Sequence, residues 1–484
     1  MNRVGVGLAA LGLSLLGGLA HAESADCAKL TSLALPHATV TAAAETPAGQ
    51  VTACKIDVTS KPTADSDIRI EVWLPEGAAW NGRYVQLGNG GFAGRINPRG
   101  LLALASQGYA VAMTDDGHEA DGTDGRWAIG HPEKVVDFGW RALKETTENA
   151  KALIRAFEGA GPKYAYFQGC SDGGREALME AQRFPDDFDG IIAGAPAYNF
   201  SGLLTLAARD VQTLSRPGAM LDDAALKTLE SGALAACGGG TYIRDQAGCQ
   251  FDAASVACAP GHAPPGCLTP TEVAAAEEIG RGIVARGGAV IYPGHSPGAE
   301  GEPGATSTWT TGGGNLPQSL SYKFAAGFWG GFVYGDAGYD VTKLDIAGAA
   351  KAAAAVAKEV DSTDPDLSKF RAHGGKLIQY HGWNDPAIPS RGSIVYYEEV
   401  GRKLGDTSDF YRLYMIPGML HCGGGQGPSS VNWLGTLTAW VEGHNAPDAL
   451  TAVYAAPGQP PAPGAATQRL CPWPRKPQEG GRCA

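Results

Sequence analysis

The stretch YAYFQGCSDGG, from Tyr164 to Gly174, joins an apolar run of strand type to a glycine-rich turn, and a helical pattern follows over residues 175–183. Its part GCSDG has the form G-x-S-x-G, with Ser171 in the middle. Between a strand and a helix, this pattern is typical of a nucleophile elbow, in which flanking glycines permit a tight turn that lifts the serine above the edge of a sheet. The pattern favours Ser171 as a nucleophile; the alternative is an ordinary serine in a glycine-rich turn.

The segments on both sides of this turn alternate between strand and helix patterns. Short apolar runs suit strands that are buried on both faces, and a long amphipathic pattern over residues 135–157 predicts a helix. Strands that alternate with helices predict a parallel, doubly wound sheet, so the fold class is α/β. Together with the elbow, this order predicts an α/β-hydrolase fold with a large inserted lid domain. The expected strands cover residues 68–74, 84–87, 109–113, 164–168, 191–194, 376–380 and 411–416.

The chain of 484 residues is too long for one core, because single cores stop growing near about 250–300 residues. From residue 198 to residue 361 the strand pattern gives way to helical pieces and to loops rich in Gly, Pro and Cys, which we interpret as the lid. The expected organisation is a signal peptide at 1–22, the first part of the hydrolase core at 23–197, the lid at 198–361 and the second part of the core at 362–484.

The amino-terminal segment has the three parts of an export signal: a charged start, an apolar stretch from Val4 to Ala20, and a small-x-small site that ends at Ala22. A membrane anchor is the alternative, but no stop-transfer pattern follows, and no later segment offers about 18 apolar residues in a row. We therefore expect cleavage after Ala22 and a protein that is secreted or periplasmic.

The charge of the chain restricts its partners. The formal net charge is −12 and no basic run is present, whereas nucleic acids and anionic membrane surfaces are bound through clustered Lys and Arg. We therefore expect a small-molecule partner, with no nucleic acid and no membrane.

Two loops that follow strands provide the other groups that a serine nucleophile needs. Asp385 comes shortly after the strand at 376–380, and His421 follows the strand at 411–416, so the order Ser, Asp, His is that of the α/β-hydrolases. We expect His421 to be the general base and Asp385 to orient it, although an Asp before a proline also caps turns. His381 is interpreted as a structural residue under the loop.

An oxyanion hole in this fold combines the N–H after the nucleophile with an N–H from an early glycine loop. The expected donors are Asp172 and either Gly91 or Gly90, because glycine lets the backbone approach a substrate closely. The alternative for the glycine loop is a simple strand-to-helix turn.

The ten cysteines fit an exported protein, and their even number permits five disulfides. No CxxC pair or HExxH motif is present, so we expect no metal held by such motifs. Cys170 precedes the serine and Cys422 follows the histidine, so contact between Ser171 and His421 would bring these two cysteines together.

The chain resembles the tannase and feruloyl esterase family, whose members carry a Cys-Ser, an Asp and a His-Cys in which the two cysteines form a bridge. Cys170-Ser171, Asp385 and His421-Cys422 supply these elements, and the segments 88–94, 131–138 and 188–196 match as well. The resemblance covers nearly the whole mature chain and implies hydrolysis of esters of aromatic acids such as ferulate or gallate. It also implies the pairs Cys27–Cys54, Cys170–Cys422, Cys237–Cys249, Cys258–Cys267 and Cys471–Cys483.

The chain departs from the family in two places. The family usually binds calcium in an Asp-rich lid loop between two cysteines, but the loop from Cys237 to Cys249 holds one Asp, so we expect no cofactor. Asp172 stands where a small uncharged residue is common, and its carboxylate would repel an anionic substrate if it pointed inward. Six aromatic residues of the lid form either a wall over the serine or, as we favour, the lid core: Trp309, Phe324, Phe328, Trp329, Phe332 and Tyr334.

These observations predict a secreted serine carboxylic ester hydrolase that cleaves esters of feruloyl or galloyl type through an acyl-enzyme. A hydrolase of mono(2-hydroxyethyl) terephthalate, or of another non-plant aromatic ester, is the alternative within the same chemistry. An inactive, hydrolase-like binding module is the alternative of another class, and a missing triad member would be its mark.

Overall fold

The computed structural model describes residues 1, 26–285, 287–288, 290–456 and 459–484. Apart from Met1, the expected signal peptide at 1–22 lies outside this part of the chain. Among the described residues, no helix combines the length and the apolar character needed to cross a membrane.

A nine-stranded sheet forms the centre of the molecule, in the order β1-β2-β3-β5-β4-β6-β7-β10-β11. The six strands from β5 to β11 are parallel, whereas β1, β2 and β3 join antiparallel at one edge. The strands are β1 (Ala38–Ala48), β2 (Val51–Ser60), β3 (Ile68–Pro75), β4 (Arg83–Leu87), β5 (Ala110–Thr114), β6 (Tyr164–Cys170), β7 (Gly190–Gly194), β10 (Lys376–Gly382) and β11 (Tyr411–Ile416). The mostly parallel sheet confirms the predicted α/β class.

The first two strands differ from the sequence-based expectation, which begins the sheet at residue 68 and makes it parallel throughout. In β1 only Val40 and Ala48 are buried, because this strand lies at the edge of the sheet. Its Ala- and Thr-rich sequence therefore lacks the apolar alternation that marks a half-buried strand.

Helices cover both faces of the sheet because neighbouring residues of the buried strands point to opposite sides. In β6, Phe167 belongs to the core under α3, α4 and α12, and Tyr166 belongs to the core under α13. In β7, Ile191 and Ile192 divide in the same way. The helices of this part are α1 (Pro98–Ala105), α2 (Pro132–Val136), α3 (Ala142–Glu158), α4 (Asp172–Arg183), α12 (Arg391–Leu404) and α13 (Trp433–Gly443).

Two helices differ in detail from their predictions. The pattern over residues 135–157 is divided into α2, a π-helical turn at Asp137–Arg141 and α3. Helix α4 begins at Asp172, directly after the serine, and not at residue 175. Its first turn contains Gly173 and Gly174, whose low helix propensity hides the helix start from sequence patterns.

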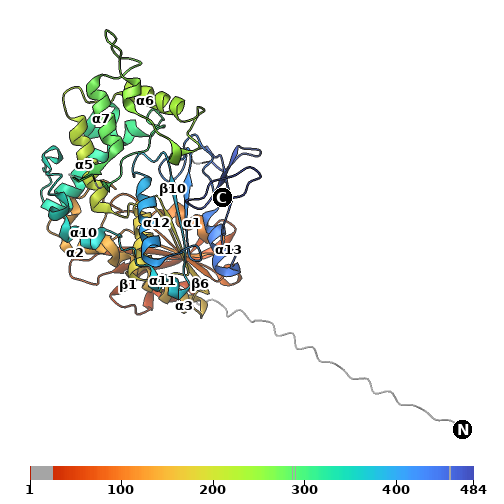
Figure 1. Cartoon of the computed structure of the whole chain (residues 1–484). Coiled ribbons are helices and arrows are strands. Elements are labelled where there is room, and N and C mark those ends of the chain that lie inside the picture. The colour runs from red at the N-terminus through yellow and green to blue at the C-terminus, as the bar shows by residue number, and fades with distance from the viewer. Residues whose placement is uncertain (2–25, 286, 289, 457–458) are drawn as a thin grey trace.

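The segment between β7 and β10 adds no described strand to the central sheet. Its helices α5, α6 and α7 gather at one end of the molecule (Figure 1). The prediction that residues 198–361 form a separate lid domain stays a prediction. The elements of the segment are α5 (Phe200–Leu214), α6 (Asp223–Ala236), α7 (Pro270–Arg281), β8 (Ile283–Val284), β9 (Val290–Tyr292), α8 (Leu320–Ala326), α9 (Ala349–Ala352), α10 (Ala354–Val360) and α11 (Ser368–His373).

A small hairpin of β12 (Leu450–Val453) and β13 (Thr467–Leu470) follows α13. The carboxyl ends of β6, β10 and β11 open at one edge of the sheet, since these strands are parallel. The loops after these three strands carry Ser171, Asp385 and His421, so the topology itself gathers them.

Candidate active site

Ser171 lies at a sharp turn between β6 and α4. Its φ of 68° and ψ of −120° are unfavourable for a residue with a side chain. The turn is held by the Ser171 N–H, which donates to the Gly194 carbonyl at 3.0 Å. Such strain at a strand-to-helix turn is the geometry of a nucleophile elbow, and it places the hydroxyl at the amino-terminal end of α4.

Three glycines make this turn possible because no side chain fits at their positions. A Cβ on Gly169 would lie 2.2 Å from the Gly173 carbonyl oxygen, and a Cβ on Gly173 would lie 2.7 Å from the Asn89 carbonyl oxygen. A Cβ on Gly174 would lie 2.2 Å from the Gly194 carbonyl oxygen. The glycines of the motif therefore allow α4, β6 and the loop after β4 to approach one another closely.

His421 connects the serine to Asp385. Its Nε2 lies 2.9 Å from the Ser171 hydroxyl oxygen, and its Nδ1 lies 2.7 Å from Oδ2 of Asp385. The backbone N–H groups of Ala387 and Ile388 donate to the other carboxylate oxygen, Oδ1, at 2.8 and 2.9 Å. The structure thus brings together the three residues that the sequence predicts as a triad.

The carboxyl group of Asp385 is fully buried, yet it is held in the ionised form. Burial raises its pKa, but the charge of His421 and the hydrogen bonds from two imidazoles outweigh burial, and the pKa lies well below its ordinary value. An ionised Asp385 is suited to orient the His421 ring and to stabilise an imidazolium.

The second imidazole belongs to His381, which sequence reasoning interprets as structural. His381 is fully buried, and its Nε2 lies 3.1 Å from Oδ2 of Asp385 and 3.1 Å from the Ile388 carbonyl oxygen. Its Nδ1 lies 2.7 Å from the Ser393 hydroxyl oxygen. His381 therefore bonds the same carboxylate oxygen as His421. The sequence signal for this contact is the spacing of four residues between His381 and Asp385. Spacing alone does not distinguish a hydrogen-bond partner of Asp385 from a purely structural residue.

Three backbone N–H groups are candidates for an oxyanion hole. In the described part of the chain, those of Asp172, Gly90 and Gly91 have no protein acceptor. Gly91 and Asp172 both line the cavity that contains Ser171. A Cβ on Gly91 would lie 2.4 Å from the Gly122 carbonyl oxygen, and its φ is +63°, so glycine is required there. The geometry favours Gly91 over Gly90 as the second donor.

Cys170 and Cys422 form a disulfide across a sequence separation of 252, with their Cα atoms 6.0 Å apart. The bridge joins the residue before the serine to the residue after the histidine. The other four disulfides are the pairs that the family resemblance implies: Cys27–Cys54, Cys237–Cys249, Cys258–Cys267 and Cys471–Cys483. Five disulfides are typical of proteins that fold in an oxidising compartment.

The carboxylate of Asp172 is neutralised. Arg175 donates to it through Nε at 2.5 Å and through Nη2 at 3.1 Å, and both side chains are buried. Arg175 also donates to the carbonyls of Gly139 and Phe138 at 2.8 and 3.0 Å. Because Arg175 binds both carboxylate oxygens, Asp172 repels an anionic substrate less than an unpaired carboxylate would.

Five of the six aromatic residues singled out in the inserted segment divide between the two expected roles. Trp309 and Phe324 line the cavity beside Ser171, and the Trp309 ring stands edge-on to the His421 ring with centroids 5.2 Å apart. Tyr334 is exposed. The remaining three belong to a core that joins α5 to Phe92 and Phe138 of the central part: Phe328, Trp329 and Phe332.

The loop between Cys237 and Cys249 does not fit a calcium ion. Its single carboxylate, Asp245, accepts from the Lys476 ammonium through both oxygens at 2.8 Å, and Oδ1 also accepts from the Gly248 N–H. Calcium prefers about six to eight oxygen ligands, several of them carboxylates. A lysine already neutralises the one carboxylate present, so no step of the chemistry is assigned to this loop.

Comparison with known proteins places this geometry in a family. The model of the family "Tannase and feruloyl esterase" matches residues 52–483. The chain is 37% identical over 526 residues to an uncharacterized esterase of Xanthomonas campestris pv. campestris, with 97% of this chain and 90% of that protein covered. It is 31% identical over 421 residues to a probable feruloyl esterase B-1 of Aspergillus fumigatus, with 82% and 77% covered.

Among solved structures, that of feruloyl esterase B from Aspergillus oryzae matches with a TM-score of 0.86 at 26% identity, covering 95% of this chain and 99% of that one. The fold is therefore the α/β-hydrolase fold predicted from the sequence. A serine at the elbow of this fold, hydrogen-bonded to a histidine, is the arrangement of a carboxylic ester hydrolase. The chain is a carboxylic ester hydrolase. It belongs to the tannase and feruloyl esterase family.

Proposed function

We propose that Ser171, His421 and Asp385 are the catalytic triad of this hydrolase and that its substrates are esters of aromatic acids of the feruloyl type. The observation that carries the proposal is the unbroken series of contacts from the Ser171 hydroxyl through His421 to Asp385, beside a cavity with aromatic walls. A non-catalytic binding module has no need of such a series, so the structure gives that alternative no support.

The reaction follows from the contacts. The Ser171 oxygen attacks the ester carbonyl carbon while His421 Nε2 takes the hydroxyl proton. The N–H groups of Asp172 and Gly91 donate to the oxyanion of the tetrahedral intermediate. His421 then gives the proton to the departing alkoxide, which leaves an acyl-enzyme. Water, deprotonated by His421, attacks this ester, and the intermediate breaks down to release the acid and Ser171.

The acyl group is proposed to occupy the cavity beside Ser171. Its walls are mostly apolar, and the described residues that line it include no Lys or Arg. An uncharged aromatic ring gains from burial there, because transfer of apolar surface from water is favourable. The apolar wall is formed by Phe200, Leu203, Leu204, Trp309, Phe324 and Ile388.

The same cavity argues against the terephthalate monoester as the preferred substrate. A second carboxylate on the ring would be buried without a cationic partner. Such burial costs several kcal/mol of binding free energy, so we expect the terephthalate monoester to bind weakly. A galloyl ring has three hydroxyls, and besides Ser171 and the paired Asp172 the lining offers Ser321 as a polar side chain. A feruloyl-type ring, with fewer hydroxyls, fits this lining better.

We also propose that the protein is secreted or periplasmic, that neither nucleic acid nor a membrane is a partner, and that calcium is not required. The disulfides support export, the net charge of −12 supports the absence of polyanion binding, and the Asp245–Lys476 pair supports the absence of calcium.

The test is a hydrolysis panel with the full mature chain. Methyl ferulate, methyl gallate, chlorogenate and mono(2-hydroxyethyl) terephthalate are compared by kcat/KM for the wild type and for Ser171→Ala. We expect methyl ferulate or chlorogenate to rank first and Ser171→Ala to lose turnover while its melting temperature is retained. A panel in which the terephthalate ester ranks first would overturn the proposed acyl preference, and full activity of Ser171→Ala would overturn the proposed mechanism.

A further inference from the structure

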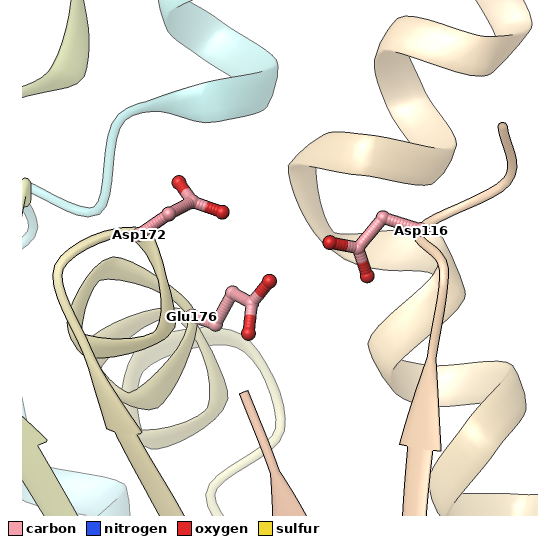
Figure 2. Close-up of side chains that lie close together, drawn as sticks. All are labelled: Asp116, Asp172 and Glu176. Atoms are coloured by element: carbon pink, nitrogen blue, oxygen red, sulfur yellow. The ribbon is translucent and has the colours of Figure 1, made fainter. Parts of the chain in front are cut away.

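Three buried carboxyl groups lie together behind the oxyanion loop, which we define as residues 88–91. Figure 2 shows Asp172 and Glu176 on α4, with Asp116 opposite them beyond the end of β5. One oxygen of each lies within 4.8 Å of the others, and the exposed fractions are 0% for Asp116 and Glu176 and 1% for Asp172. Three negative charges this close in a dry site would repel one another strongly, so some of them must be neutralised.

Arg175 binds both oxygens of Asp172 and so neutralises its charge. The carboxyl groups of Asp116 and Glu176 remain to be neutralised. Oxygens of Asp116 and Glu176 lie within 4.8 Å of each other, and both side chains are fully buried. Two ionised carboxylates this close in a buried site repel each other strongly, and one proton kept by the pair removes this repulsion. Burial and the neighbouring negative charges raise the pKa of Glu176 to about 7 and that of Asp116 well above its ordinary value.

A metal ion suits this cluster less well than a proton. Both oxygens of Asp172 are bound by Arg175, and Asn89 donates to one oxygen each of Glu176 and Asp116. In the part of the chain that the structure describes, Oδ1 of Asp116 and Oε1 of Glu176 have no hydrogen-bond partner. Calcium requires about six to eight oxygens.

The acid pair holds the oxyanion loop through Asn89. The Asn89 N–H donates to Oε2 of Glu176 at 2.9 Å, and its side-chain amide donates to Oδ2 of Asp116 at 3.0 Å. The same amide donates to the Thr114 carbonyl at 2.8 Å. Asn89 directly precedes Gly90 and Gly91, so its position sets where their N–H groups point.

We propose that Asp116 and Glu176 share one proton and act as positioning residues, which hold Asn89 and thereby aim the Gly91 N–H at the oxyanion. The inference rests on the proposed function, because it concerns the oxyanion hole of the same reaction. Loss of the shared proton at alkaline pH leaves two adjacent carboxylates that repel each other and release Asn89. The expected consequence is a fall of kcat at alkaline pH with little change in KM.

No neighbouring group replaces this proton. The ionisable groups that face the pair are Arg175, Asp172, Glu180 and His118. Arg175 is already bonded to Asp172. Burial raises the pKa of Glu180 well above its ordinary value, which favours its neutral form, and lowers that of His118 to about 4, so His118 supplies no positive charge at neutral pH.

The test compares a variant that has a permanent hydrogen-bond donor at position 116, Asp116→Asn, with a variant that lacks the side chain, Asp116→Ala. Asp116→Asn keeps an oxygen for Asn89 and supplies an N–H in place of the shared proton, and asparagine tolerates the φ of +61° at this position. We expect it to retain kcat at neutral pH and to lose the alkaline fall. Asp116→Ala leaves Asn89 without this anchor, and we expect kcat to drop about 10²-fold at unchanged KM.

Glu180→Gln is the matched control, because Glu180 is equally buried on α4 but does not bond Asn89. It should keep the wild-type pH profile. An Asp116→Asn variant that still shows the alkaline fall would overturn the inference. So would an Asp116→Ala variant that is folded and has wild-type kcat, or a stoichiometric divalent metal that Asp116→Asn removes. Hydrolysis of methyl ferulate by the wild type tests the proposed function separately, and its failure would count against that function.

Discussion

The Nε2 atom of His421 lies 2.9 Å from the hydroxyl oxygen of Ser171, although 250 residues separate the two positions in the chain. Two features produce this contact. Parallel β6 and β11 end at the same edge of the sheet, and the Cys170–Cys422 disulfide joins their following loops directly. The backbone and the bridge together fix the distance across which the proton must move.

Removal of this disulfide is expected to lower activity more than its effect on stability explains. In a Cys170→Ala/Cys422→Ala variant the His421 loop gains freedom, and a displacement of about 1 Å at a catalytic group costs about 10²-fold in rate. The unfolding free energy should also fall, by about 2–5 kcal/mol. The measurements are kcat/KM for methyl ferulate and the melting temperature.

Cys471→Ala/Cys483→Ala provides the matched control, since this disulfide lies at the end of the chain with a sequence separation of 12. It should lower the melting temperature and leave kcat/KM unchanged. Equal losses of activity in the two double variants would contradict a specific role for the bridge beside the serine.

His381 is expected to help to keep Asp385 ionised. Its Nε2 bonds Oδ2 of Asp385, and this bond contributes to the lowered pKa of that carboxyl group. In His381→Phe the pKa of Asp385 rises toward its ordinary value, so the triad loses its negative charge at a higher pH when the solution is acidified. A carboxylate with a depressed pKa stabilises the fold until the pH falls through that pKa, so the acid limb of the melting-temperature profile should move to higher pH.

Ser393→Ala tests whether this shift is specific. Ser393 bonds the other ring nitrogen of His381 at 2.7 Å and has no direct bond to Asp385. Its acid limb should stay close to that of the wild type. A His381→Phe variant with an unmoved acid limb would show that His381 is structural alone, as the sequence suggested.

The apolar cavity predicts that one added charge changes the acyl preference. Leu203 lies on α5 and lines the cavity beside Ser171. In Leu203→Arg, a guanidinium can pair with the second carboxylate of mono(2-hydroxyethyl) terephthalate. The ratio of its kcat/KM to that of methyl ferulate should rise by about tenfold or more, which corresponds to about 1.4 kcal/mol. Leu203→Met keeps the cavity apolar and should leave the ratio unchanged, and an equal rise in both variants would point to altered shape and not to charge.

Chelation should not affect the enzyme. Because the Lys476 ammonium binds both oxygens of Asp245, the loop between Cys237 and Cys249 has no free carboxylate for calcium. After dialysis against EDTA, kcat/KM and the melting temperature should equal those of untreated protein. A lowered melting temperature that calcium chloride restores would contradict this expectation.

The three residues that the sequence predicts as a triad lie together in the structure, and each of them follows a strongly patterned strand. Ser171, Asp385 and His421 come after the buried strands β6, β10 and β11, and a parallel sheet brings such positions to one edge. Glycine is required at positions 169 and 173 because the backbones approach each other closely there. A local sequence motif indicates this requirement.

Other features depend on contacts that no local pattern carries. The partner of Asp172 is Arg175, one turn along α4, but its burial against the carbonyls of Gly139 and Phe138 requires the folded chain. The pairing of Asp116 with Glu176 likewise joins two elements that are distant in sequence. Strand β1 escaped prediction because it is mostly exposed.

The most direct test of the central claim is to find which residue becomes covalently modified. The folded enzyme is treated with a serine-directed fluorophosphonate, and the modified peptide is identified by mass spectrometry while hydrolysis of methyl ferulate is followed. The account predicts one adduct per chain, on Ser171, that forms as activity is lost and fails to form in His421→Ala. Loss of activity with the adduct on another serine and an unmodified Ser171 would contradict it.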